Sequence, residues 1–354
     1  MTLPGIGNSI SFLQIANEFG LNGTKSLGGY RFSQTIDGSG ITLPLDTGIP
    51  TSGTIKFSDF YDKRLNVVVD CFSGGEEFSI DAKQDKWDNQ NTIVVSGWGK
   101  GRKEEGSRIR IVVNKKIGES IVDTTGFGNK NNCALRTGTW NSTSQVVVDV
   151  SASGKLLGAG GKGGDGADGI TTNAENGGDG TSGLGIEQNN TVVNVYTGGI
   201  IRAGFGGGGG GGGGRETSKR DRRAGGGGGG GGAGFPVGKG GKGGIPQAGT
   251  NASGAAGQDG GDGTEVDGGN FGPGFGGGGN NANEVGGGRG GNGGDSEFNA
   301  TNGQAVTSEH VPPPGLRGLG GGNGAAIRKT SGISFTIGVS DGTVTGSTTD
   351  IGVG

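Results

Sequence analysis

The sequence predicts a mostly β and irregular protein: a small N-terminal module, then a β-sandwich or short β-solenoid, then a bundle of glycine helices. Three observations carry this prediction. Glycine supplies 93 of 354 residues, and most of these glycines lie between residues 154 and 324. This is about a quarter of the chain, whereas glycine makes up about 7% of an average protein. Many of these glycines recur at every third position, which is the repeat of an extended three-fold helix. Runs of Val and Ile in residues 65–157 are typical of strands.

Residues 1–64 are predicted to form the N-terminal module. Residues 9–20 read as a short helix with Ser9 or Ser11 as N-cap and Gly20 at its end. Residues 54–61 read as a second short piece, in which Ser58 caps a turn. The segment 43–50 between them is too rich in Pro and Gly for regular structure. The module contains few apolar residues and can therefore bury little apolar surface by itself. We expect it to be stable mainly when it is docked on something else.

Residues 65–157 are predicted to be a β domain. Four strands are expected, at residues 65–70, 92–96, 108–113 and 145–150. The strand at 108–113 partly alternates polar and apolar residues, as a half-exposed strand would. The three tryptophans of the chain also lie in this region, which gives it enough large side chains for a core.

A strand–turn–strand pattern recurs later in the chain. It occurs at 148–156, again 45 residues later at 193–201, and near the C-terminus at 337–344. We interpret each copy as a β-hairpin arm that feeds or seals the glycine region. This predicts a β-arm at residues 190–203 within the glycine region and a C-terminal β-hairpin cap at residues 325–354.

Residues 158–324 are predicted to be an ordered glycine sandwich, against two alternatives. Disorder is the usual state of glycine-rich chains, because ordering costs roughly 1–2 kcal/mol per residue. The glycine tracts nevertheless have similar lengths and end at turn residues such as Pro236 and Pro246. Collagen needs long unbroken Gly-X-Y and plentiful proline, whereas this chain has 9 prolines. Packed polyglycine II helices, joined by backbone hydrogen bonds, remain the ordered form that fits.

The tract boundaries predict which connections lie together. Nine tracts are expected, at residues 158–169, 177–185, 204–214, 224–234, 238–244, 254–263, 268–279, 286–294 and 315–324. If successive tracts are antiparallel, the connections 170–176, 215–223, 245–253 and 280–285 share one end. The segments 235–237, 264–267 and 296–314 then share the other end. The charged segment 215–223 becomes the most prominent loop.

Glycine tracts alternating with variable polar loops resemble the tail-fibre-tip adhesins of T-even-type bacteriophages, over about residues 154–324. In that family the tracts form a polyglycine II sandwich, and loops at one end contact the bacterial receptor. Independently, residues 10–20 and 55–61 resemble a short module found in tail and baseplate proteins of many phages, including cyanophages. Residues 65–157 have no counterpart in that adhesin, so the mode of attachment is open.

The composition excludes several other classes of protein. The net charge of −3 offers no basic excess for a nucleic-acid partner. No run of about 20 apolar residues is present, and the N-terminus lacks the features of a secretory signal. Cys71 and Cys133 are expected to be free thiols. His310 is the only histidine, which excludes histidine clusters.

Motifs with possible chemistry are weak. Residues 163–171 fit a calcium nonapeptide, but no tandem copy follows in register, so a chance match is favoured. A single RGG-like segment at 286–291 lacks aromatic neighbours for RNA binding. Carboxylates on glycine loops lack the buried setting that tunes catalytic groups. We therefore expect no enzyme activity, no cofactor and no metal.

The resemblance implies a tail fibre or baseplate adhesin of a virion, made in the host cytoplasm, which recognises a glycan or outer-membrane protein of the host. A purely structural tail component and an ice-binding protein are the alternatives. The expected receptor-binding residues are Arg215, Glu216, Lys219, Arg220, Arg222, Arg223, Asn280, Asn281, Asn283 and Glu284. Residues 1–64 are expected to bind other tail proteins. The expected virion-attachment residues are Phe12, Ile15, Phe19, Phe57, Phe60 and Tyr61.

Overall fold

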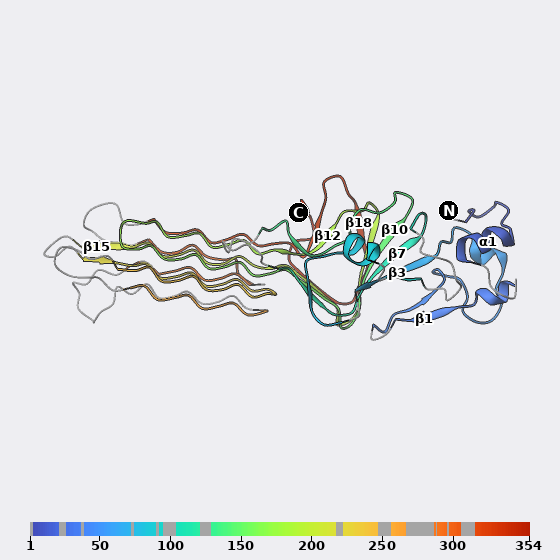
Figure 1. Cartoon of the computed structure of the whole chain (residues 1–354), viewed down its shortest axis with the longest axis horizontal. Coiled ribbons are helices and arrows are strands. Elements are labelled where there is room, and N and C mark those ends of the chain that lie inside the picture. Colours follow the sequence, from blue (N-terminus) through green and yellow to red (C-terminus); the bar gives the residue numbers. More distant parts are fainter. Residues whose placement is uncertain are drawn as a thin grey trace.

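The computed structural model describes residues 3–20, 26–36, 39–71, 74–89, 92–94, 104–120, 129–216, 222–246, 256–266, 287, 289–295, 297–305 and 316–354. These residues form an elongated, mostly β molecule (Figure 1). An N-terminal unit, residues 3–64, lies at one end, and glycine tracts extend from the other. Between them lies a β body, formed by the described residues within 65–157, 182–202 and 325–354.

Three sheets make up the β body. The first sheet has the order β18 (Phe335–Ser340), β13 (Thr191–Val195), β10 (Gln145–Val150), β7 (Arg108–Val113), β3 (Asn66–Cys71), β6 (Thr92–Val94). The second has the order β19 (Thr343–Thr345), β14 (Ile200–Arg202), β11 (Lys155–Leu157), β8 (Lys116–Gly118), β4 (Glu77–Phe78). The third has the order β20 (Asp350–Ile351), β17 (Ile327–Lys329), β12 (Ser182–Ile186), β9 (Cys133–Arg136), β5 (Ile80–Asp81).

The chain visits the three sheets in the same order five times. Apart from β6, which is an additional strand of the first sheet, each round places one strand in each of the three sheets, from β3–β4–β5 to β18–β19–β20. Neighbouring strands are parallel, except for β6, which pairs with β3 antiparallel. The expected hairpins are therefore wrong. β13 and β14 lie in different sheets, as do β18 and β19, because these strands pair with strands of the neighbouring rounds and not with the next strand along the chain.

A hairpin arm of the N-terminal unit covers the outside of the first sheet. It consists of β1 (Ser33–Thr35) and β2 (Thr42–Pro44), so the segment expected to lack regular structure begins with a strand. Ile36, Ile41 and Leu43 of the arm pack on Val68 and Val112 of the sheet. This cover explains why β7 is buried along most of its length and not half-exposed, as its alternating sequence predicted.

The N-terminal unit packs on the β body. Its helix α1 (Phe12–Phe19) begins at Ser11, whose hydroxyl accepts from the Gln14 N–H in a capping box. The short helices η1 (Leu27–Tyr30) and η2 (Phe57–Phe60) follow, and Ser58 lies inside η2 instead of capping it. The π-helix η3 (Ala82–Asp88) belongs to the body.

One apolar core joins the N-terminal unit to the body. Its members from the unit include Ile15, Phe19, Tyr30 and Phe60, whose side chains are fully buried. The surface on which the unit was expected to dock is therefore this chain's own β body. The two cysteines are free, as expected, and both are buried. Burial raises the pKa of both thiols to about 12. Neither is a nucleophile at neutral pH.

Candidate functional site

The glycine tracts are long excursions of the chain between the second and third sheets. Residues 158–181 connect β11 to β12, and residues 203–326 connect β14 to β17. We number the described tracts in chain order, and together they form the glycine array. They are tracts 1 (158–169), 2 (174–181), 3 (203–213), 4 (225–234), 5 (238–244), 6 (256–263), 7 (289–295), 8 (299–304) and 9 (316–324). The tract expected at 177–185 thus begins earlier, at residue 174, and ends at residue 181, because β12 (Ser182–Ile186) follows it directly.

Tracts 1 and 3 continue the parallel pairing of the strands that precede them. In the second sheet Leu157 is paired with Arg202. The same alignment then runs on along the tracts, since Gly161 N–H donates to the Phe205 carbonyl at 2.8 Å and Gly164 N–H to the Gly208 carbonyl at 2.8 Å. The body therefore sets the register and direction of the array.

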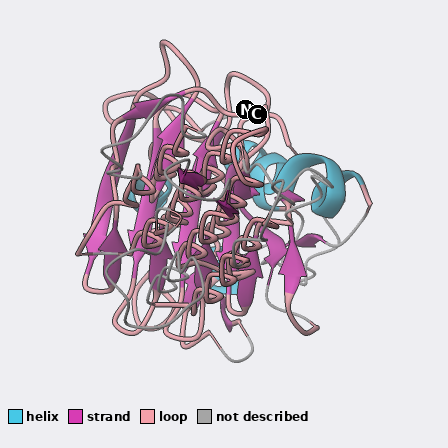
Figure 2. Cartoon of the chain, turned by 90° about the vertical axis from the view of Figure 1, so that its left-hand side faces the viewer, coloured by secondary structure: helices cyan, strands magenta, loops and turns pink. Residues whose placement is uncertain are grey.

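Backbone hydrogen bonds with a period of three join tract 3 to six neighbours. Gly207, Gly208 and Gly209 donate to three different tracts, through the carbonyls of Gly178, Gly230 and Thr301. Gly210 returns to the first of these directions, at Glu175. Tract 3 also accepts from tracts 1, 7 and 9, through the N–H groups of Gly161, Gly164, Ala167, Gly291, Gly294, Gly318, Gly321 and Gly324. Seen along the array, the tracts lie as rows of coils in front of the strands (Figure 2).

This surrounded position explains why residues 206–214 are all glycine. A Cβ on Gly207 would overlap the Lys162 carbonyl, one on Gly208 the Gly291 carbonyl, and one on Gly209 the Gly318 carbonyl. Three successive positions thus face three different backbones, and none has room for a side chain. Tract 4, which bonds to tracts 1, 3, 5, 6 and 7, has an all-glycine run at 225–232 for the same reason.

Outward positions of the rim tracts carry Asp or Asn side chains that accept backbone N–H groups from the next tract. Asn173, Asn176 and Asp179 of tract 2, or next to it, accept from tract 9 at 3.0, 2.8 and 2.6 Å. The same arrangement recurs elsewhere on the rim. The further pairs are Asp165 with Lys242, Asp168 with Ile245, Asp259 with Gly243, Asp262 with Gly240 and Asn302 with Gly320. These side chains complete the backbone pairing where no further tract follows.

The calcium reading of residues 163–171 has no support in this geometry. The Asp165 carboxylate accepts the N–H of Lys242 in tract 5, and the Asp168 carboxylate accepts the N–H of Ile245, which follows that tract. Asp165 also pairs with Lys162 at 3.1 Å. Among the described residues, no group of three or more His, Cys, Asp or Glu side chains is placed to hold a metal ion.

The base of the array is fixed to the second sheet by Glu265. Its carboxylate lies near three basic side chains from successive strands: Lys116 of β8 at 3.4 Å, Lys155 of β11 at 3.9 Å and Arg202 of β14 at 3.8 Å. Beside it, the Phe235 ring stacks on Phe78, with ring centroids 5.4 Å apart. The links 235–237 and 264–266 therefore lie at the body end, as predicted.

The opposite end of the array carries the turns. Tracts 1, 3 and 5 run in parallel away from the body, so the connections that follow them, 170–173, 215–223 and from 245 on, begin at the same far end, as predicted. Figure 1 shows β15 (Gly214–Glu216) there, farthest from α1. It pairs antiparallel with β16 (Arg222–Ala224). The segment 296–314 does not stay at one end, as was expected, because residues 299–304 form tract 8, parallel to tract 3.

The hairpin of β15 and β16 brings four of the expected receptor-binding residues together. Arg215 is opposite Arg223, and Glu216 is opposite Arg222. The other six lie outside the described residues, namely Lys219, Arg220, Asn280, Asn281, Asn283 and Glu284.

The expected virion-attachment residues divide into two groups. Ile15, Phe19 and Phe60 are fully buried in the chain's own core, so they cannot contact a partner while the chain is folded. Their apolar spacing indicated a buried face, but not what covers it. Phe12 and Tyr61 are half-buried, and Phe57 is 41% exposed. Sequence reasoning missed two more exposed apolar side chains of this unit, Ile6 and Leu13.

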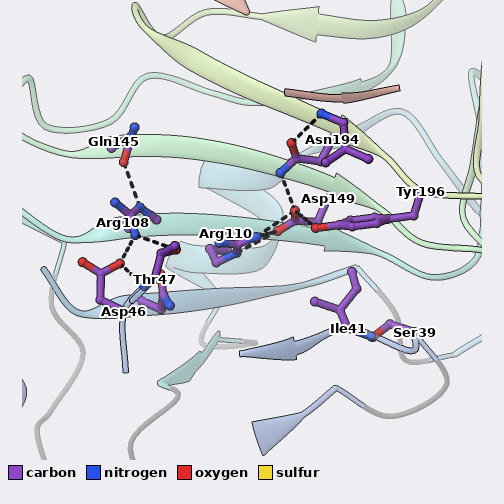
Figure 3. A network of polar contacts seen from close by, with 12 residues as sticks. Ser39, Ile41, Asp46, Thr47, Arg108, Arg110, Gln145, Asp149, Asn194 and Tyr196 are labelled. Atoms are coloured by element: carbon purple, nitrogen blue, oxygen red, sulfur yellow. Dashed lines mark hydrogen bonds and ion pairs between the residues drawn. The ribbon is translucent and has the colours of Figure 1, made fainter. Parts of the chain in front are cut away.

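A buried polar network clamps four strands of the first sheet (Figure 3). Asp149 of β10 accepts two hydrogen bonds from Arg110 of β7, both at 2.8 Å, and one from Asn194 of β13 at 2.9 Å. The Tyr196 hydroxyl donates to the same carboxylate at 3.2 Å. Asn194 in turn accepts from the Val339 N–H of β18. Burial and the Asp149 charge raise the pKa of Tyr196 to about 12.

This network is structural. The side chains of Arg110 and Asp149 are buried, and the arm packs against Tyr196, so a substrate has no access to them. The neighbouring Arg108 pairs with Asp46 of the N-terminal unit and donates to Gln145 (Figure 3). Polar contacts thus reinforce the attachment of the unit to the sheet.

No protein-family model, curated protein or solved structure matches this chain. No helix in the described part of the chain is both long enough and apolar enough to span a bilayer.

Proposed function

We propose that this chain is a bacteriophage tail fibre or baseplate adhesin, which recognises the host cell surface through loops at the far end of the glycine array. The observation that carries the proposal is the period-three hydrogen bonding of the tracts, which holds the turns at one end, remote from the N-terminal unit. A pre-ordered scaffold loses little entropy when its loops bind, and loops on rigid scaffolds are a common recognition design. The role needs no catalytic step.

The finer architecture belongs to the same proposal. We infer that the glycine tracts are polyglycine II helices packed side by side, since three residues separate successive bonds to the same neighbour. The five rounds of strands through three sheets are consistent with a short β-solenoid. In this arrangement the solenoid is the base from which the array projects.

The N-terminal unit is the proposed attachment to other tail proteins. It lies at the opposite end from the turns, as an adhesin that bridges virion and host requires. Ile6, Leu13 and Phe57 are 84%, 67% and 41% exposed there, so apolar surface is available to a partner. We accordingly place the protein in the virion tail.

Replacing residues 215–223 by a Gly-Ser segment of equal length should lower binding of the protein to host cells by at least about tenfold. The physical reason is the removal of the charged residues that this segment contains. The measurement is the cell-bound fraction of labelled protein, with circular dichroism as the check on folding.

A matched control replaces Glu297 and Phe298, which are exposed next to tract 8 near the body, by Gly and Ser. Its binding should equal that of the wild type. If the variant with residues 215–223 replaced is folded and still adsorbs to cells as the wild type does, this segment is not the receptor-binding loop. If no variant at the far end affects adsorption, the purely structural alternative is favoured.

A further inference from the structure

The surroundings of tract 3 show how the tracts pack. Its six neighbours form a closed ring in the order 1, 2, 9, 8, 7 and 4, since hydrogen bonds join each of these tracts to the next. Around the ring, tracts that donate to tract 3 (1, 9 and 7) alternate with tracts that accept from it (2, 8 and 4). With three residues per turn, the N–H groups point in three directions and the carbonyl groups in three others.

Tract 4 has five described neighbours. Hydrogen bonds join these five in the order 6, 5, 1, 3 and 7, so one position of the ring is left, between tracts 7 and 6. We call it the sixth position. Tract 4 donates to tracts 6, 1 and 7 and accepts from tracts 5 and 3. By the alternation around tract 3, a tract in the sixth position donates to tract 4.

Carbonyl groups of tract 4 point to the same conclusion. Of its three sets of carbonyl groups, one accepts from tract 3 and one from tract 5. The third set belongs to Gly225, Gly228 and Gly231, and none of the described residues donates a backbone N–H to it. All three residues are buried. Because buried carbonyl groups are nearly always paired, we expect their donors in the sixth position.

The chain itself has to cross the array at this place. Tract 6 runs antiparallel to tract 5, and so toward the body. Tract 7 runs antiparallel to tract 3 and therefore begins at the far end. There a Cβ on Gly287 would meet the carbonyl of Gly225, the residue that follows β16. The connection 267–286 thus leaves from one side of the sixth position at the body and arrives at its other side at the far end.

This connection has a suitable length and composition. It has 20 residues, and about ten residues of an extended three-fold helix already span about 31 Å. It contains the tract expected at 268–279, which lies outside the described residues. Glycines such as those at 276–279 allow the close approach of backbones that packed tracts require.

From these observations we infer that the connection 267–286 fills the sixth position, and that it donates to the carbonyl groups of Gly225, Gly228 and Gly231. The array then has three layers: tracts 5, 1 and 2, tracts 6, 4, 3 and 9, and the added tract with tracts 7 and 8. The end of the connection, residues 280–286, lies at the far end beside the hairpin of β15 and β16. Its location follows from the tract directions, whereas a receptor role for it rests on the proposed function.

Gly230→Ala tests whether the sixth position is filled. In tract 4 a Cβ on Gly228 would meet tract 5 and one on Gly229 would meet tract 3, so the period of three directs a Cβ on Gly230 toward the sixth position. The variant should lower the urea midpoint of unfolding by at least about 0.5 M. Gly322→Ala is the matched control and should not lower it, because a Cβ there would meet only the Asp179 side chain.

Hydrogen exchange of the wild type identifies the occupant, and it decides the matter if Gly230→Ala does not fold. The amides within 268–279 that face tract 4 should exchange at least about a hundredfold slower than in an unstructured chain. Exchange of all amides of 268–279 at the unstructured rate would overturn the inference. So would a Gly230→Ala variant that is as stable as Gly322→Ala. Neither measurement uses host cells, so both are independent of the adhesin role.

Discussion

Gly321→Ala is expected to lower the free energy of unfolding of the glycine array by about 3 kcal/mol or more. A Cβ at this position in tract 9 would overlap the backbone carbonyl of Gly178. The Gly321 N–H also donates to Gly207 of tract 3. Since the obstacle is the backbone of tract 2, and both tracts are hydrogen-bonded to further neighbours, neither tract can move away without breaking hydrogen bonds of its own.

The adjacent glycine supplies a matched control. A Cβ on Gly322 would point outward and meet only the Asp179 side chain, at 3.2 Å. Gly322→Ala should therefore be neutral or stabilising by about 0.4–1 kcal/mol, because alanine restricts the unfolded chain. Chemical unfolding, followed by circular dichroism, measures both variants. Equal effects at the two positions would contradict the tract packing described here.

Asp149→Ala is expected to destabilise the β body by about 3–5 kcal/mol, because it leaves the buried Arg110 guanidinium without its counter-charge. Asn194 and Tyr196 lose an acceptor as well. Tyr196→Phe removes one of these hydrogen bonds and should cost only about 1 kcal/mol. Urea unfolding at neutral pH measures all of these variants.

Replacing both charged partners distinguishes the effect of an unpaired buried charge on stability from the effect of lost packing. Arg110→Met combined with Asp149→Leu should recover more than half of the stability lost in Asp149→Ala, since well-packed apolar pairs commonly replace buried ion pairs at little cost. A double variant as unstable as Asp149→Ala would show that the uncompensated charge is not the cause.

The glycine pattern carried much of the information about the array. Tracts 3 and 4 are surrounded along residues 206–213 and 225–232, where every position is glycine, and these long runs are visible in the sequence. Rim tracts need glycine only where they face a neighbour. Tract 8 has a single glycine, Gly303, which faces Gly210. One glycine gives no recognisable period, so this tract was missed. The segment 296–314 was therefore wrongly expected to stay at one end of the array.

The strands were easier to predict than their partners. Runs such as Val67–Val68–Val69 predicted strands correctly, but pairing occurs between rounds that are tens of residues apart. The 45-residue repeat was visible, yet it was read as local hairpins. Likewise the apolar spacing of Phe19 and Phe60 predicted a buried face and could not reveal that the chain's own body covers it. The Asp and Asn acceptors on the rim were missed, although their spacing of three at 173, 176 and 179 was a usable signal.

Hydrogen–deuterium exchange of residues 206–213 tests most directly the claim that the glycine array is an ordered scaffold. Each of these amides is inside the array, and most of them donate to a neighbouring tract. The packing described here predicts exchange at least about a hundredfold slower than in an unstructured chain. Exchange of the all-glycine tract at the rate of an unstructured chain would contradict it.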